Sequence, residues 1–287
     1  MSKDKVVIRR SLNTVVYILV VICTLLSLFP TVYALILAMI KESAGYQMYE
    51  NPAIIFQSIT LENFKKVFEK YPIMRWTLNS FIVAVSSTVL YTFIASLAAF
   101  SFSRLRYPGR KIIFTICLSS MLIPGVINIV PNNILIREMG LYNSLLAMIL
   151  PGLGGVGGVF LIKQFMDNIP KDFDEIARVD GASNFRIYWS VILPMCKPVL
   201  IAQAVFSFQG AWNDFLWPII VTDNSASRTL AAGLYIDVLS QAQYRGLVCA
   251  ASIISAIPII VLYIFGQKYF TQGVGRGGLK RWEISNI

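Results

Sequence analysis

The sequence contains no histidine among its 287 residues. This absence excludes the serine–histidine and cysteine–histidine pairs of nucleophilic enzymes and removes the commonest zinc ligand. The four cysteines lie in or beside apolar stretches and lack metal-ligand spacing, so they are expected to be small buried side chains. They are Cys23, Cys117, Cys196 and Cys249. We therefore predict no catalytic residue and no metal ligand in this chain.

Charge is also scarce. Only 14% of the residues are charged, whereas 56% are hydrophobic, which lies outside the usual range for a soluble domain. The net charge of +10 would suit nucleic acid, but the basic residues are scattered between apolar runs and form no dense stripe. The composition predicts a membrane protein with lipid, and not nucleic acid, as its surroundings.

Six nearly uncharged stretches are long enough to cross a bilayer, which takes about 20 apolar residues as a helix. They are Ser11–Ile40, Trp76–Ser103, Ile112–Ile136, Met139–Ile162, Pro198–Val221 and Gly246–Gln267. The first is too long for a signal peptide and lacks a convincing cleavage site, so it is expected to remain as an anchor. We predict an all-α membrane fold with an N-terminal segment (1–10), a six-span domain (11–268) and a tail (269–287).

The distribution of positive charge predicts the orientation. Of the 25 Lys and Arg residues, 17 lie at the N-terminus, in residues 104–111, in residues 163–197, or after residue 267. Positive charge accumulates on the cytoplasmic side of membrane proteins. Both termini and the 163–197 loop are therefore predicted to be cytoplasmic.

Two connecting segments carry local signals. Residues 104–111 form a tight basic turn whose Arg104, Arg106, Arg110 and Lys111 are expected to anchor at anionic lipid headgroups. On the opposite side, Leu61, Phe64, Val67 and Phe68 have helical spacing and predict a short interfacial helix.

Proline and glycine interrupt the third and fourth predicted spans. The prolines are Pro124, Pro131 and Pro151, and the glycines are Gly152, Gly154, Gly155, Gly157 and Gly158. Such residues permit close helix packing and also suit moving bundles. The sequence leaves both interpretations open.

The longest polar interruption among the later apolar segments is residues 169–198, IPKDFDEIARVDGASNFRIYWSVILPMCKP. It predicts two short helices joined at Gly181, the first beginning at Pro170 with acidic residues in its first turn. Ser183 or Asn184 is suited to cap the second helix. In that helix aromatic and aliphatic residues recur at helical spacing and are expected to form a stripe. Its members are Phe185, Tyr188, Trp189 and Ile192. A structured loop of this kind predicts a docking surface.

This stretch resembles the EAA loop of ABC importer permeases. Glu175-Ile176-Ala177 is followed after three residues by Gly181 and after nine more by Val191-Ile192-Leu193-Pro194. Ile176 and Val191 depart from the family pattern but keep apolar side chains. In that family the loop is a coupling helix that sits in a cleft of a cytoplasmic ATPase.

The resemblance implies a set of ATPase-coupling residues. They are Asp174, Glu175, Ile176, Ala177, Asp180, Gly181, Ala182, Phe185, Leu193 and Pro194. An amphipathic connector on the membrane surface, with solvated acids, is the alternative. Glu175 either pairs with a basic residue of the ATPase or favours the helix start. Gly181 supplies either a left-handed or a tightly packed backbone position.

The fifth predicted span contains an acid. A charged side chain at this depth costs roughly 2.5–3.5 kcal/mol, so Asp214 is expected to face protein or water. With Trp212, Asn213 and Trp217 it offers hydroxyl-binding groups and flat stacking faces, which suit a sugar pathway. The alternative is that Asn213 and Asp214 bond between helices near the outer interface, within an ordinary tryptophan belt.

The tail contains Gly273, Gly275 and Gly278 in the order of a dinucleotide fingerprint. They follow a membrane span and no βαβ unit surrounds them, so they are interpreted as part of a flexible basic tail. The sequence also lacks a phosphate-binding P-loop, so no ATP site is assigned to this chain.

Motifs along nearly the whole chain are similar to those of the six-span permease of maltose-type carbohydrate importers. They include LENF, RLRYPGRK, IPKDFDEIARVDGAS and WNDFLWP. The resemblance implies a type I ABC importer permease of the bacterial cytoplasmic membrane that imports sugars, and the family's substrates range from disaccharides and longer glycans to uronates, sialic acids and glycerol phosphates. Neutral oligosaccharide is the preferred class, because an acidic substrate would want a basic residue in the pathway and no predicted span has one at its centre. The resemblance also implies a second homologous permease, two cytoplasmic ATPases that bind ATP and Mg²⁺, and an extracellular or periplasmic solute-binding protein. An ion-coupled secondary transporter is the main alternative, and a membrane-integral enzyme is disfavoured because Asp214 has no catalytic partner.

Overall fold

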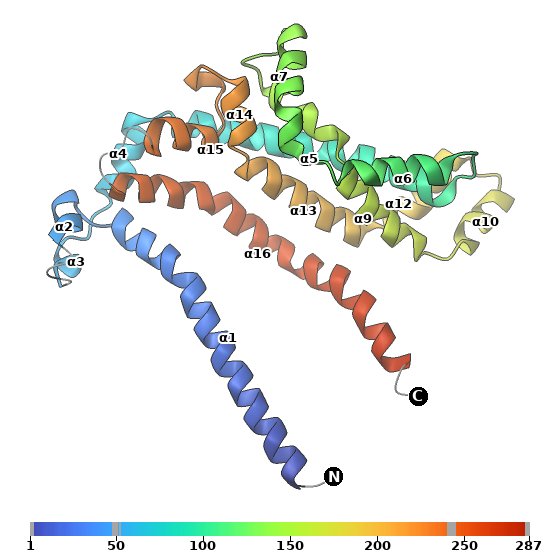
Figure 1. The fold of residues 1–287 in the computed structure, drawn as a ribbon, viewed down its shortest axis with the longest axis horizontal. Coiled ribbons are helices and arrows are strands. Elements are labelled where there is room, and N and C mark those ends of the chain that lie inside the picture. Colours follow the sequence, from blue (N-terminus) through green and yellow to red (C-terminus); the bar gives the residue numbers. More distant parts are fainter. Residues whose placement is uncertain (1–2, 48–50, 52, 240–244, 285–287) are drawn as a thin grey trace. The chain divides into compact units, whose positions relative to one another are not determined.

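The computed structural model describes residues 3–47, 51, 53–239 and 245–284. Its regular structure is helical, with one isolated antiparallel bridge between Ile40 and Ile59. The chain divides into two compact units, Met1–Tyr71 with Asp237–Ile254, and Pro72–Ile236 with Ser255–Ile287. An all-α fold is therefore confirmed (Figure 1).

Three of the described helical segments are long and apolar enough to cross a membrane. They are Asn13–Ala38, Ile73–Arg104 and Arg245–Ile264. Three bent pairs bring the number to six if each pair forms one crossing, in agreement with the predicted count. The pairs are Arg110–Ser120 with Gly125–Glu138, Leu145–Gly154 with Val156–Asp167, and Asn184–Met195 with Lys197–Asn213.

The first unit contains the long helix α1 and three short helices. Their bounds are α1 (Lys3–Ala38), α2 (Glu42–Gln47), α3 (Ile54–Gln57) and α4 (Glu62–Lys70). Helix α4 is the predicted interfacial helix, but its buried side chains are Asn63 and Val67, while Leu61 and Phe68 are exposed. Asn63 Nδ2 donates to the carbonyl oxygens of Ala38 and Ile40, both at 2.9 Å, and so satisfies orphan acceptors at the end of α1.

The second unit is built around α5 (Ile73–Arg104). No glycine or proline occurs within α5, so it continues as one helix of 32 residues. It packs side by side with α9 (Val156–Asp167) and α13 (Lys197–Asn213) (Figure 1). The contact face of α5 has small buried side chains, including Ala84, Ala95 and Ala99, which let the helices approach closely.

The other helices of this unit are short. They are α6 (Arg110–Ser120), α7 (Ile129–Glu138), α8 (Leu145–Ile149), α10 (Asp172–Val179), α11 (Asn184–Ile187), α12 (Leu193–Met195), α14 (Leu216–Val221) and α15 (Leu230–Gly233). Helix α16 (Arg245–Ile284) contributes to both units. Helix α16 continues to Ile284, so the glycines of the predicted tail have helical backbone.

The predicted third, fourth and fifth spans are all broken. The third turns by 90° between Ser120 and Gly125, where Pro124 lacks an N–H donor. The fourth bends by 47° between Gly154 and Val156, where Gly155 has extended backbone angles. In the fifth span, α13 ends at Asn213, and Asp214 has extended backbone angles before α14 begins. Helix breaks at proline were predictable, but the break at Asp214 was not.

Candidate functional site: the coupling loop and a polar cavity

The first helix of the loop, α10, has the predicted charge pattern. Asp172, Asp174 and Glu175 lie in its first turn, where negative charge favours the helix dipole. It ends at Gly181, whose φ of +77° is left-handed. The Gly181 N–H donates to Arg178 O at 3.0 Å and the Ala182 N–H donates to Ala177 O at 2.9 Å, the two bonds of a Schellman motif. Since a Cβ at Gly181 would meet no neighbouring group within 4 Å, the glycine is needed for its backbone angle and not for packing.

The second helix begins with the predicted serine cap. Ser183 Oγ accepts a hydrogen bond from the Arg186 N–H at 3.3 Å and starts α11. The helix then widens into a π turn over Tyr188–Ile192, which changes the direction of successive side chains. As a result Phe185 and Trp189 are exposed, at 64% and 53%, whereas Tyr188 and Ile192 are buried. The three aromatic rings lie next to one another, as the predicted stripe requires, but burial divides the stripe into an exposed edge and a buried edge.

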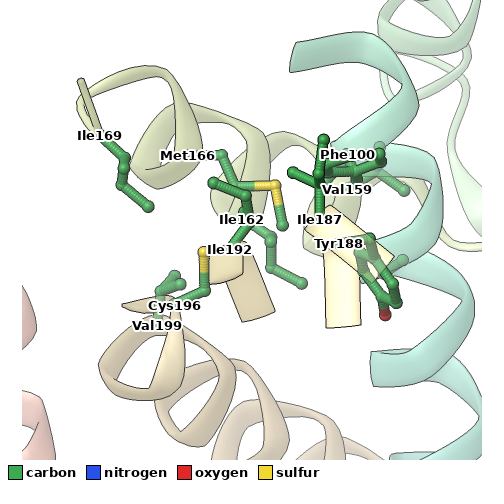
Figure 2. Close-up of a cluster of buried hydrophobic side chains, with 12 residues drawn as sticks. Phe100, Val159, Ile162, Met166, Ile169, Ile187, Tyr188, Ile192, Cys196 and Val199 are labelled. Carbon is green, nitrogen blue, oxygen red and sulfur yellow. The ribbon is translucent and has the colours of Figure 1, made fainter. Parts of the chain in front are cut away.

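A buried apolar cluster supports the loop from beneath. Figure 2 shows its side chains converging from α5, α9 and the α11–α13 segment. Its members include Phe100, Val159, Ile162, Met166, Ile169, Ile187, Tyr188, Ile192, Cys196 and Val199. Tyr188 also shares a hydrogen bond of 2.8 Å with Ser96 on α5 and packs edge-on against Phe100. The loop is thereby fixed to the membrane helices.

The outer face of the loop is apolar and exposed. Ile176 is 63% exposed and Val179 is 87% exposed, on the same short helix as exposed Phe173. The rings of exposed Phe185 and Trp189 stack at 6.4 Å. Since large exposed apolar side chains gather here on the polar loop that is predicted to be cytoplasmic, this face has the chemistry of a protein-docking surface.

The predicted coupling residues divide between this face and the underlying core. Glu175, Ile176, Asp180, Gly181, Phe185 and Pro194 are exposed. Ala177, Ala182 and Leu193 are partly buried and pack against the cluster. Asp174 differs from both groups, because it is buried in an ion pair.

That ion pair joins Asp174 to Arg104, the last residue of α5. Arg104 Nε lies 3.3 Å from Asp174 Oδ2, and the two side chains are 2% and 9% exposed. Burial raises the pKa of the Asp174 carboxyl, and the Arg104 guanidinium only partly opposes this shift. Arg104 is thus buried in protein, which contradicts the prediction that it anchors at lipid headgroups. Nothing in the apolar run before it signals this contact.

A polar cavity of about 460 Å³ lies between α5, α13 and the break in the fifth span. Its polar lining groups are Ser87, Tyr91, Ser207, Asn213 and Asp214. Asp214 Oδ1 also accepts a hydrogen bond of 3.4 Å from the Trp217 N–H. The structure therefore brings two of the four predicted pathway residues to one cavity. Sequence reasoning did not find Ser87, Tyr91 or Ser207, because they lie within ordinary apolar runs.

The two tryptophans have packing contacts instead. Trp212 is buried, stacks on Phe208 at 5.7 Å, and donates its indole N–H to Ser255 O. Trp217 donates its indole N–H to Ala147 O at 2.9 Å. Neither tryptophan lines the cavity.

Tyr91 also fixes the start of α9. Its hydroxyl accepts a hydrogen bond of 2.7 Å from the Gly158 N–H, one of the first donors of that helix. A Cβ at Gly155 or Gly158 would lie within 3 Å of the Tyr91 hydroxyl oxygen, whereas Gly152 and Gly154 have open space around them. Close packing is therefore confirmed for two of the five glycines in this segment.

Comparisons with curated proteins give relatives of the same length. The chain is 31% identical over 268 residues to the maltodextrin transport system permease protein MdxG of Bacillus subtilis, covering 90% of this chain and 96% of that protein. It is 29% identical over 275 residues to the sn-glycerol-3-phosphate transport system permease protein UgpE of Yersinia pestis, covering 93% and 97%. It is 29% identical over 263 residues to the arabinooligosaccharides transport system permease protein AraQ of B. subtilis, covering 90% and 92%.

Among solved structures, the fold is similar to a chain of a bacterial ABC transporter involved in the import of the acidic polysaccharide alginate. The TM-score is 0.80 at 22% identity, over 94% of this chain and 99% of that chain. Residues 6–276 match the family described as binding-protein-dependent transport system inner membrane component. The chain therefore belongs to this family, the multi-pass inner-membrane permeases of ABC importers.

Proposed function

We propose that this permease imports a neutral oligosaccharide and receives the energy for transport through the α10–α11 loop. ATP is hydrolysed by a separate subunit of such transporters, and a solute-binding protein works with them. In the proposed assembly this chain pairs with a second homologous permease and two cytoplasmic ATPases, with both of its termini in the cytoplasm. This family gives no support to the ion-coupled alternative.

The observation that carries the energy-receiving role is the docking face of the loop. By docking face we mean the exposed side chains of Phe173, Ile176, Val179, Phe185 and Trp189. An exposed apolar patch of this kind marks a site that interacts with another protein or with a membrane, and the acidic residues beside it favour a protein partner. Glu175 lies beside the patch and is exposed, so it is available for an ion pair with the ATPase.

In the proposed cycle, ATP closes the ATPase dimer and draws the coupling loops together. This movement opens the substrate pathway outward, and ATP hydrolysis returns it to the inward-open state. The chain itself performs no chemistry. Its role is to convert displacement of the loop into a change in the side of the membrane from which the cavity can be reached.

The lining of the polar cavity supports a neutral substrate. Hydroxyl, amide and carboxylate groups converge there beside the aromatic ring of Tyr91, which is the chemistry of carbohydrate sites. Within the described part of the chain, no Lys or Arg lines this cavity, and the carboxyl of Asp214 would repel an anion. The relatives named for maltodextrin and arabinooligosaccharides fit this choice better than the one named for glycerol 3-phosphate.

The test is uptake by proteoliposomes that contain this chain with its co-purified partners. A panel of labelled neutral oligosaccharides, uronate oligosaccharides and glycerol 3-phosphate would be offered with the cognate solute-binding protein. We expect ATP-dependent uptake of a neutral oligosaccharide. Uptake restricted to anionic substrates, or uptake that persists without ATP, would contradict the proposal.

Variants of the cavity provide a second test. Asn213→Ala and Asp214→Asn should lower uptake while leaving co-purification of the ATPase unchanged, because the cavity and the docking face are separate. The matched control is Asn128→Ala, an exposed asparagine that makes no side-chain cap hydrogen bond and does not line the cavity. Equal uptake by Asn213→Ala, Asp214→Asn and the control would show that the cavity does not contact substrate.

A further inference from the structure

We propose that Arg104 and Asp174 form a link that transmits movement of the coupling loop to α5, and that Arg104 is a positioning residue for energy coupling. This inference rests on the proposed function, because it assigns a physical connection between the docking face and the polar cavity. It concerns two side chains that are buried inside this chain and are not part of the docking face.

The first step of the argument is that one guanidinium joins three segments. Arg104 ends α5, and its Nη2 donates to Met166 O at 3.0 Å and Ile169 O at 2.9 Å. These carbonyls belong to the last turn of α9 and to the residue that leads into the loop. Met166 O also accepts the Ile169 N–H at 3.1 Å, so the guanidinium joins an existing turn at the end of α9. The same guanidinium faces Asp174 in the first turn of α10.

The second step is that this contact resists sliding. Both side chains are almost fully buried, so water cannot replace either partner when the helices shift. Ser103 strengthens the connection, since its Oγ donates to Asp167 Oδ1 at 2.7 Å. By contrast, the ion pair of Lys65 with Glu69 is exposed and would exchange with water at little cost. The end of α5 and the start of α10 are therefore expected to move together.

The third step is that stability alone does not explain the pair. Among the described residues, Asp174 Oδ1 and Arg104 Nε have no hydrogen-bond partner with good geometry. A buried ion pair with incomplete hydrogen bonding is often no more stable than an apolar replacement. The pair is better explained by a requirement for a specific, directional contact at this point of the loop.

The fourth step is that α5 reaches the cavity without interruption. Tyr91 and Ser87 line the cavity and lie on the same helix as Arg104. The 13 residues from Tyr91 to Arg104 span about 20 Å at the rise of an α-helix. Since α5 has no proline or glycine to bend at, displacement of its cytoplasmic end reaches the cavity wall.

The experiment uses the complete assembly in lipid nanodiscs and needs no knowledge of the sugar. A cysteine is introduced as Ser87→Cys, with Cys23, Cys117 and Cys249 replaced by alanine and the buried Cys196 retained. The labelling rate of this cysteine by a small maleimide is measured with and without ATP. In the parent assembly we expect ATP to change the labelling rate, because ATP changes how easily the maleimide can enter the cavity.

Asp174→Asn is the principal variant, because it keeps the size of the side chain and removes the charge. We expect it to reduce the ATP-dependent change about fivefold or more, within the usual range of coupling between sites. Asp172→Asn makes the same substitution at an exposed position of α10 and should behave like the parent. Co-purification of the ATPase is measured in each case, so that loss of docking is recognised.

A second pair of variants keeps the positive charge. Arg104→Lys replaces the planar fork with a single ammonium group that cannot hold both carbonyls and the carboxylate, so the response should again fall. Arg106→Lys, at an exposed position of the same turn, is its control. A full response in both Asp174→Asn and Arg104→Lys would overturn the link.

Two other outcomes bear on the proposed function. An unresponsive parent assembly would contradict the proposed ATP coupling. Loss of oligosaccharide uptake with an intact labelling response would contradict only the proposed substrate.

Discussion

Gly181 ends α10 by adopting a left-handed backbone angle of +77° in open surroundings. A β-branched side chain there would clash with its own backbone and not with a neighbour. For an ordinary residue the left-handed conformation costs roughly 1–2 kcal/mol. That cost falls on the turn that sets the angle between α10 and α11.

Gly181→Val should therefore leave insertion intact but reduce the population of the correctly docked loop. A loss of one to two kcal/mol corresponds to a fall of roughly 5–30-fold in that population, and ATP-driven uptake should fall with it. Asn tolerates the left-handed region better, so Gly181→Asn should be milder. Proteoliposome uptake, normalised to inserted protein, measures both variants, and wild-type uptake by Gly181→Val would refute the assignment.

Asp174 predicts a pH dependence of stability. Burial raises its carboxyl pKa above the ordinary Asp value, while Arg104, Arg178 and Lys171 lower it and Glu175 raises it further. Because the folded state then binds the proton more tightly than the unfolded state, the contribution of this group is largest below the ordinary pKa of about 3.9 and is lost as pH rises through the raised pKa. Above both values, Asp174 opposes folding.

Thermal unfolding of the parent and of Asp174→Asn should be compared from about pH 4 to pH 7. The difference in their stability at each pH measures the contribution of the Asp174 carboxyl. The stability of the parent relative to the variant should fall as pH rises. Asp174→Ala should be more severe, costing about 3–5 kcal/mol, because Asn can still accept a hydrogen bond from the Arg104 guanidinium, whereas Ala leaves this buried charge with no side-chain acceptor. Parallel pH curves for the parent and Asp174→Asn would show that burial does not shift this carboxyl.

Individual roles on the loop were only partly predictable from the sequence. The Ser183 cap and the left-handed glycine could be predicted because each depends on only a few adjacent residues. The pairing of Arg104 with Asp174 is a contact across 70 positions, and a basic residue at the end of a span predicts lipid headgroups equally well. Long-range burial was the missing information.

The packing of α9 against α5 depends on the absence of a side chain at two glycines. A Cβ at Gly158 would lie 2.8 Å from the Tyr91 hydroxyl oxygen and 2.9 Å from Gln203 Nε2. Both neighbours are held in place, since the Tyr91 hydroxyl accepts the Gly158 N–H and Gln203 is buried. The helices would therefore have to separate to admit a methyl group.

Gly158→Ala should destabilise the purified protein by about 1–3 kcal/mol, the usual cost of overpacking. Gly154→Ala is the matched control, because a Cβ at that position would meet nothing within 4 Å. Thermal unfolding in one detergent compares the two. Similar transition temperatures for Gly158→Ala and Gly154→Ala would show that this contact is not tight.

Elements were predicted more reliably than their interruptions. Apolar length identified the helical stretches, but periodicity did not predict the π turn at Tyr188–Ile192, which adds a residue to one turn and separates Phe185 and Trp189 from Tyr188 and Ile192. It also did not predict the break at Asp214, since WNDFLWP contains no residue before Pro218 that must end a helix. Both interruptions lie beside the proposed functional surfaces.

For the chain as a whole, the orientation in the membrane remains a prediction from charge. It can be tested with single cysteines on exposed positions at opposite sides, Glu69→Cys in α4 and Arg106→Cys after α5. We expect an impermeant maleimide to label the first variant in intact spheroplasts and the second only after permeabilisation. Labelling of Arg106→Cys in intact spheroplasts would reverse the assigned topology.

The π turn separates two kinds of evolutionary constraint within a single stretch of chain. Tyr188 and Ile192 are enclosed by the core, so substitutions there disturb the fold, whereas Phe185 and Trp189 are exposed, stack on each other and lie beside Tyr188. Mutations at the two exposed aromatics can therefore accumulate without loss of folding. Under the proposed docking of the ATPase on this face, a permease built in this way can adapt to a different ATPase, or come to share one with another importer, by changing a few surface residues.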